Sequence, residues 1–144
     1  MDEQLVGESD HVELARLVTE IAWRTDHGKA DTVHELFVDD GEMALGQTTL
    51  RGRDAIGDWG RQRVAATYRT RHVCANMRFV ARGADGAEGI TLLIQYTDAG
   101  DQKNWALPRV VGEDRDRFVR TDRHDGACES KSPVVTAFNL SPDA

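Results

Sequence analysis

Helical and strand patterns are segregated along this chain, and this order constrains its fold more than any other feature. Apolar residues recur at helical spacing only before position 67, whereas strand patterns separated by turn signals fill residues 69–138. The predicted helices are residues 11–25, a short one starting near Asp31, and residues 53–66. Helices that precede a long antiparallel meander indicate an α+β fold, with about three helices packed on a strongly curved sheet. Such a sheet leaves a concave space in which small-molecule sites commonly lie.

Turn signals divide the second half of the chain into strands. The expected strands are residues 42–46, 48–51, 69–82, 88–98, about 105–123 and 127–138. We read Asp39-Asp40-Gly41 as a turn before the first of them. Strict alternation along residues 69–82 would place His72 and Asn76 on the same face. We expect one domain over residues 1–144, with loose ends at 1–9 and 139–144.

Charge and hydropathy narrow the range of partners. Asp and Glu outnumber Lys and Arg by 25 to 18, so the net charge is −7 and nucleic acid is not expected as a partner. The arginines between positions 115 and 123 alternate with acids from Glu113 to Asp122, which we interpret as one solvated, mixed-charge strand face. No run of about 18 apolar residues predicts a membrane span.

Features of the N-terminus and the cysteines suggest a cytoplasmic location. The first ten residues are acidic and lack the basic start and apolar run of a secretory signal. Cys74 and Cys128 are too few for a disulfide scaffold or a four-ligand zinc site. We therefore expect a reducing cytoplasm and no zinc site of that kind.

Asp26 and His72 are the candidate catalytic residues. Asp26 ends the first predicted helix, and His72 lies in the middle of a predicted strand. A carboxylate that accepts a hydrogen bond from one imidazole nitrogen orients the ring and leaves the other nitrogen free to take a proton. A pair without a Ser or Cys nucleophile suits proton abstraction. The alternatives are that Asp26 is only a polar helix end, and that His72 is a half-buried or edge histidine bonded to backbone.

Four segments in chain order resemble SnoaL-like proteins of the NTF2-like superfamily. They are IAWRTDHGKADTVHELFVDDGEMAL, GRDAIGDW, TRHVCANMRF and VVGEDRDRFVRTDRHDG. The resemblance implies a cone-shaped α+β barrel and a homodimer. The chain is similar to scytalone dehydratase, bile-acid 7α-dehydratase and hexachlorocyclohexane dehydrochlorinase. In these enzymes an Asp on the first helix and a His on a central strand act as a pair, without metal or organic cofactor. Asp26 and His72 match these positions, and Lys131 is the nearest match to an Arg on the last strand of the dehydrochlorinase.

These patterns favour a cofactor-independent lyase or isomerase for a small, largely apolar substrate of polyketide, steroid or terpenoid type. The residues expected to contact that substrate are Asn76, Trp23, Tyr96, Trp105 and Lys131. The family's dehydratases carry tyrosines where this chain has Trp23 and Thr25. A non-catalytic binding or assembly module, possible because fold alone does not fix function, and an epoxide hydrolase or polyketide cyclase remain open alternatives.

Overall fold

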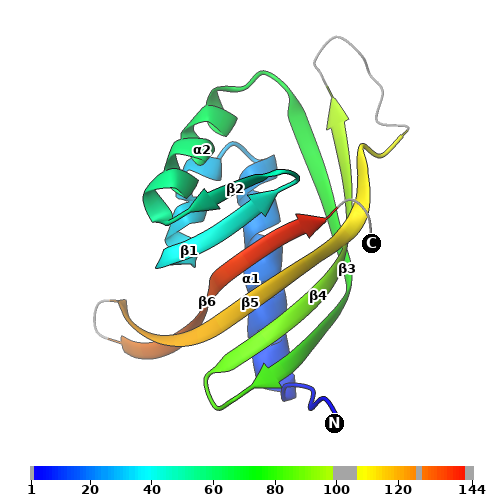
Figure 1. Cartoon of the computed structure of the whole chain (residues 1–144). Coiled ribbons are helices and arrows are strands. Elements are labelled where there is room, and N and C mark those ends of the chain that lie inside the picture. The colour runs from blue at the N-terminus through cyan, green and yellow to red at the C-terminus, as the bar shows by residue number, and fades with distance from the viewer. Residues whose placement is uncertain (1, 99–106, 126–127, 142–144) are drawn as a thin grey trace.

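The computed structural model describes residues 2–98, 107–125 and 128–141, with side chains up to Thr121 (Figure 1). Its elements are α1 (Glu8–Asp26), the 3₁₀ helix η1 (Ala30–Leu36), β1 (Phe37–Leu45), β2 (Thr48–Arg51), α2 (Arg53–Ala65), β3 (Arg69–Arg82), β4 (Gly86–Asp98), β5 (Val110–Asp125) and β6 (Cys128–Ser141). The α+β class is confirmed.

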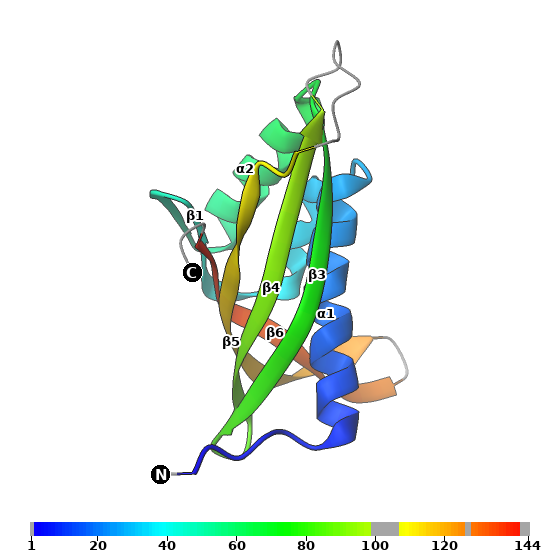
Figure 2. The same ribbon diagram turned by 90° about the vertical axis from the view of Figure 1, so that its right-hand side faces the viewer.

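The strands form one six-stranded sheet in the order β2-β1-β6-β5-β4-β3. Only β1 and β6 pair in parallel; the other neighbours are antiparallel. Helix α1 runs alongside β3 (Figure 2). The long strands of the sheet are bent, and α1 lies on the concave face that they form. The sheet ends at β2 and β3, so the described strands form an open sheet instead of the expected closed barrel.

Helix α1 is held by a single apolar stripe. Leu14, Leu17, Val18 and Ile21 recur at helical spacing, and each is at most 7% exposed. They pack with buried side chains of the sheet and of η1 and α2; these are Val33, Phe37, Met43, Ile56, Phe79, Ala87 and Phe118. Burying a large apolar side chain stabilises a fold by roughly 1.5–3 kcal/mol. This core therefore fixes α1 against the sheet and determines where its last residue lies.

Described residues near both ends of the chain pair with the sheet or belong to it. The backbone N–H of Val6 donates to the Phe79 carbonyl at 3.1 Å, and that of Ala81 donates to the Gln4 carbonyl at 2.8 Å. An edge strand offers unpaired backbone groups, and the N-terminal residues pair with those of β3. At the other end, residues 139–141 belong to β6.

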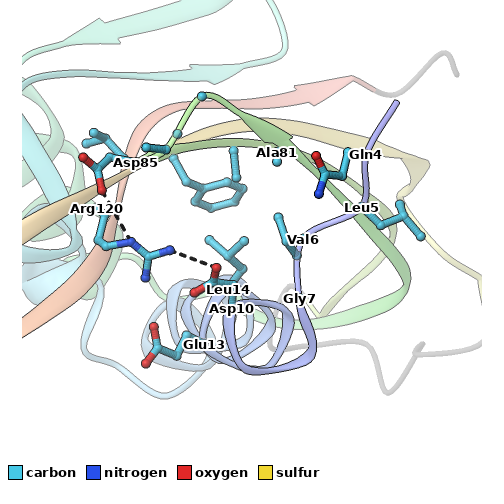
Figure 3. A pocket seen from close by; sticks show the side chains of 16 residues that line it. Gln4, Leu5, Val6, Gly7, Asp10, Glu13, Leu14, Ala81, Asp85 and Arg120 are labelled. Carbon is cyan, nitrogen blue, oxygen red and sulfur yellow. Dashed lines mark ion pairs between the residues drawn. The ribbon is translucent and has the colours of Figure 1, made fainter. Parts of the chain in front are cut away.

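Helix α1 begins at Glu8, earlier than predicted, and Asp10 does not cap it. Instead Asp10 forms an ion pair of 2.9 Å with Arg120, which also lies 3.8 Å from Asp85 (Figure 3). These contacts line a hollow between the start of α1 and the β3–β4 turn. Both carboxylates come from segments far apart in the sequence, so Arg120 ties α1 to this end of the sheet.

Irregularities in β1 and β3 depart from the patterns predicted for these segments. Asp39-Asp40-Gly41 is not a turn but part of β1, where the register with β6 shifts between Phe37 and Glu42. In β3 the register shifts between Ala75 and Arg78, and Asn76 has a φ of 51°. A bulge adds a residue to one strand and reverses the alternation beyond it. The predicted face shared by His72 and Asn76 is therefore wrong, and Asn76 is exposed.

Candidate active site

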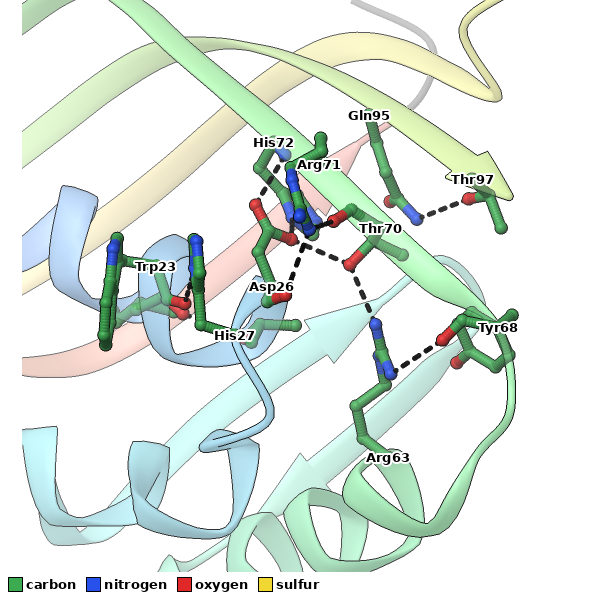
Figure 4. A network of polar contacts seen from close by, with 12 residues as sticks. Trp23, Asp26, His27, Arg63, Tyr68, Thr70, Arg71, His72, Gln95 and Thr97 are labelled. Atoms are coloured by element: carbon green, nitrogen blue, oxygen red, sulfur yellow. Dashed lines mark hydrogen bonds and ion pairs between the residues drawn. The ribbon is translucent and has the colours of Figure 1, made fainter. Parts of the chain in front are cut away.

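The end of α1 meets the beginning of β3 through the carboxylate of Asp26 (Figure 4). Its Oδ2 accepts the backbone N–H of His72 at 2.8 Å. Its Oδ1 accepts the Thr70 hydroxyl at 2.7 Å and lies 2.5 Å from Nδ1 of His72. Because β3 is an edge strand, the N–H of His72 has no neighbouring strand on that side. Three hydrogen bonds thus offset the unfavourable position of a carboxylate at a helix C-terminus.

The pKa of Asp26 lies below its ordinary value despite the burial of the group. Burial alone would raise the pKa of this carboxyl. The side-chain hydrogen bond and the charge of His72, the backbone N–H of His72 and the Thr70 hydroxyl together outweigh burial and lower it. Asp26 is therefore ionised at neutral pH and can orient an imidazole beside it.

His72 presents its second ring nitrogen to a cavity. Its Nδ1 is occupied by Asp26, and no described residue binds Nε2. The side chain is 13% exposed and lines the cavity wall, while the Asp26 side chain behind it is 6% exposed. With Nδ1–H donating to the carboxylate, Nε2 carries the lone pair that can accept a proton.

The cavity has a volume of about 210 Å³ and lies between α1, α2 and the concave face of the sheet. Its apolar wall consists of Val18, Ile21, Ala22, Met43, Leu45, Trp59 and Leu93. Its polar side chains are Thr25, Arg63, Tyr68, Thr70, His72, Cys74, Gln95 and Asp114. An apolar space with a few convergent polar groups is typical of a small-molecule site.

Arg63 of α2 connects to the Asp26–His72 pair through Thr70. Its guanidinium donates to the Thr70 hydroxyl at 2.9 Å and to the Tyr68 carbonyl at 3.3 Å, and it lies 4.4 Å from the centre of the Tyr68 ring. The Thr70 hydroxyl in turn donates a hydrogen bond to the Asp26 carboxylate. This chain of contacts fixes the rotamer of the acid without placing a cation directly on it (Figure 4).

Several residues predicted to contact substrate lie elsewhere. Asn76 is exposed at the β3 bulge. Tyr96 pairs with Arg71, on the face opposite to the cavity-lining pair of Gln95 and His72. Trp23 is 43% exposed and stacks on His27, with ring centroids 4.5 Å apart.

Two further predicted residues cannot be assigned to the cavity. Trp105 falls outside the described residues. Lys131 lies on β6 opposite Asp122, and its side chain is also outside the description.

The sequence interpretation missed the acids inside β5. Asp114 and Asp116 are buried, 1% and 3% exposed, whereas Arg115 and Arg117 between and beside them are exposed. The buried acids alternate with the exposed arginines along β5. The prediction that acids and arginines share one solvated face was therefore wrong. The period-two pattern already places both acids on the side of Phe118, which is in the core. Burial raises the pKa of Asp114 to about 7.

Cys74 lies in the cavity wall. Burial, followed by the nearby charges of Asp114, Asp26 and Asp116, raises the pKa of its thiol to about 12. It is therefore no thiolate nucleophile at neutral pH.

Within the described part of the chain, no group of three or more His, Cys, Asp or Glu side chains could hold a metal ion. No helix in that part has the length and hydropathy to cross a membrane.

Comparisons with known proteins agree with this architecture. Residues 9–126 match the family described as SnoaL-like domain. No curated protein matches the sequence significantly. Among solved structures, Aln2 from a Streptomyces species superposes with a TM-score of 0.79 at 17% identity, covering 97% of this chain and 95% of that one.

Two structures from Novosphingobium aromaticivorans are also similar. An NTF2-like protein with a cystatin-like fold has a TM-score of 0.67 at 23% identity, covering 91% of this chain and 80% of its own. A candidate scytalone dehydratase has a TM-score of 0.64 at 15% identity, with 91% and 82% covered. At such identities these structures establish the fold alone.

Proposed function

The chain belongs to the SnoaL-like domain family, and we propose that it is a cofactor-independent lyase or isomerase in which His72 deprotonates a carbon atom of its substrate. The family includes polyketide cyclases and dehydratases. The observation that carries the proposal is the contact of 2.5 Å between Asp26 and the Nδ1 of His72 at the wall of a mainly apolar cavity. This contact supports a base with a fixed tautomer.

The reaction begins with transfer of a proton from a carbon beside a carbonyl group to Nε2 of His72. The C–H electron pair moves into the enolate, and Asp26 stabilises the imidazolium that forms. In a dehydration, the enolate then expels a β-hydroxyl group, which takes the proton from the His72 imidazolium and leaves as water, so that a carbon–carbon double bond forms and His72 is neutral again. In an isomerisation, the imidazolium returns the proton to a different carbon. A positioned general base contributes roughly 10²–10⁴-fold to such a rate.

The cavity restricts the substrate by size and polarity. Its volume of about 210 Å³ is below the roughly 300–1,000 Å³ usual for drug-sized ligands. Within the polyketide, steroid and terpenoid classes, this favours compounds with one or two rings. Trp59 and the aliphatic side chains of α1 would cover the ring faces.

Proton abstraction can be tested without knowing the natural substrate. We expect the protein to catalyse exchange of the methylene hydrogens beside the carbonyl of α-tetralone in D₂O, followed by NMR, and to dehydrate its β-hydroxy derivative to a fluorescent naphthol. His72→Gln and Asp26→Asn should each lose at least about 100-fold in rate. His27→Gln is a matched control, because His27 is an exposed histidine at the same end of α1, bonded only to the Trp23 carbonyl and stacked on the Trp23 ring.

Retention of full activity in His72→Gln would refute the proposed base. Binding of these ketones with no exchange or elimination in the native protein would favour the alternative of a ligand-binding module. Covalent addition of water to an epoxide probe, dependent on Asp26 but not on His72, would favour an epoxide hydrolase. Each alternative therefore gives a different pattern across the same three variants.

We further propose that the protein forms a homodimer through the convex face of its sheet. Val73, Ile94 and Val111 are register partners across β3, β4 and β5, and Val73 and Val111 are 46% and 53% exposed. Such a row on a sheet face favours cover by a second copy. The measurement is mass by light scattering. Val73→Lys should convert a dimer to a monomer, and a native protein that is already monomeric would refute the proposal.

A further inference from the structure

A carboxyl group is buried in the cavity wall without a hydrogen-bond partner on one of its oxygens. Asp114 of β5 is 1% exposed, and no described residue binds its Oδ1. It lines the same cavity as His72. The facing residue in the strand register is Thr91 of β4, which is 0% exposed and whose hydroxyl also lacks a partner among the described residues. Buried polar groups in folded proteins are nearly always hydrogen-bonded, so this part of the wall is unusual.

Among the side chains that the structure describes, no cation is paired with Asp114. The titratable groups in its vicinity are Cys74 and His72 on β3, Asp116 on its own strand, Asp26 on α1 and Arg63 on α2. Arg63 is engaged by Thr70 and Tyr68. Burial therefore dominates and raises the pKa of Asp114 to about 7. A large share of the molecules carry a proton on this carboxyl at neutral pH, and a protonated carboxyl is a hydrogen-bond donor.

Asp114 and His72 are separated along the concave face. Their register partners on β4 are Thr91 and Gln95, four residues apart, and β4 lies between the two strands. This corresponds to roughly 13 Å along the strands and about 10 Å across them between Cα atoms. Both side chains reach into one cavity, so a single ligand can meet both only with different parts of its structure.

We propose that Asp114 is a specificity-determining residue that donates a hydrogen bond to a carbonyl oxygen of the ligand, at the end of the cavity away from His72. The inference rests on the proposed function only in taking this cavity as the substrate site. It narrows the substrate class to compact ring compounds whose apolar body carries a carbonyl group apart from the carbon that His72 deprotonates. A site built around an unpaired buried donor discriminates against analogues that lack the acceptor.

The test compares two probes with the same bicyclic skeleton, 6-acetyl-1-tetralone and 6-ethyl-1-tetralone, which differ only in a second carbonyl oxygen at the end of the molecule away from the ring ketone. Affinities of both for the whole protein are measured by calorimetry at pH 6, and the readout is the ratio of the two dissociation constants. We expect Asp114→Leu to lower the preference for the acetyl compound by about 5–10-fold, the usual worth of one hydrogen bond between neutral groups. Asp114→Asn should keep the preference, because its amide still donates. The preference should fall by pH 8.5 in the native protein but not in Asp114→Asn.

An unchanged ratio in Asp114→Leu, loss of the preference in Asp114→Asn, or no measurable binding of either probe to the native protein would overturn the inference. Circular dichroism of both variants checks folding. His72→Gln separates this result from that of the proposed function, because it should abolish exchange and elimination while it leaves the ratio of affinities within about twofold. A preference that survives in His72→Gln without any turnover in the native protein would support recognition by Asp114 and refute the catalytic role.

Discussion

Replacement of Asp114 by Asn should stabilise the protein at high pH and have little effect at low pH. The ordinary pKa of an Asp carboxyl is 3.8, and burial raises that of Asp114 to about 7. Between these values the folded protein holds a proton that the unfolded chain has lost, so stability falls as the pH rises from about 4 to 7. At ~1.4 kcal/mol for each pH unit, the native protein loses about 4 kcal/mol over this window. Asp114→Asn does not titrate and avoids this loss.

The assay is urea unfolding of both proteins at intervals from pH 4 to 8.5, because the difference between them cancels the titration of every other group. We expect the difference to be within about 1 kcal/mol at pH 4 and to grow to about 4 kcal/mol at pH 8, which corresponds to a rise in melting temperature on the order of 10 °C. Cys74, with a pKa of about 12, does not titrate in this range. Parallel curves for the two proteins would show that Asp114 is ionised or paired when folded and would refute the reasoning.

Three further substitutions test the framework of the site. Asp26→Asn should destabilise the protein at pH 7 by about 1–3 kcal/mol. Because the pKa of Asp26 is lowered in the folded protein, the stabilisation by its carboxylate is present above pH 3.8 and is lost as the pH falls below that value. Equal losses of stability at pH 2.5 and pH 7 would contradict this prediction. Gly60→Ala should cost at least about 2 kcal/mol in denaturant unfolding, since its Cβ would lie 2.2 Å from the Ala30 carbonyl oxygen, and a neutral effect would mean that α2 moves freely from η1. Asn76→Gly should be neutral or stabilising by up to about 1 kcal/mol without changing turnover, because Asn76 has a φ of 51° and is exposed; a loss of turnover at unchanged melting temperature would return it to the site.

Local patterns predicted the elements of this fold well and their departures poorly. The bounds of β3 were predicted at residues 69–82, where the structure has them. The β1 segment was misread because Asp39-Asp40-Gly41 has the composition of a turn. In the sheet it is a bulge, and only pairing with β6, which lies about 95 residues further along, distinguishes the two. Such pairing is a property of the tertiary structure and leaves no local pattern.

The site shows the same division between local and long-range information. The positions of Asp26 at a helix end and His72 in a strand could be inferred, but Thr70 and Arg63 carry no local mark that joins them to the pair. The alternation of β3 failed at one inserted residue, which turned Asn76 outward. Tyr96 was expected to contact substrate because the sequence does not show which face of its strand is turned toward the cavity. In the structure Tyr96 and Ile94 lie on the outer face of β4, and the register partners of Ile94, Val73 and Val111, are exposed.

The error over the charged run of β5 has the greatest consequence for function. Counting charges treats Arg115 and Asp114 as one solvated surface, whereas alternation separates them onto opposite faces of the sheet. The arginines are exposed to solvent, Asp116 is buried, and Asp114 lines a cavity in which burial keeps its carboxyl partly protonated at neutral pH. Two carboxyl groups near the cavity thus differ in their pKa, which is lowered for Asp26 and raised to about 7 for Asp114. In the function that we propose, Asp26, bonded to His72, is the acceptor that orients the base, and Asp114, whose Oδ1 has no partner among the described residues, is the donor to a ligand. Environment, and not residue type, assigns these roles.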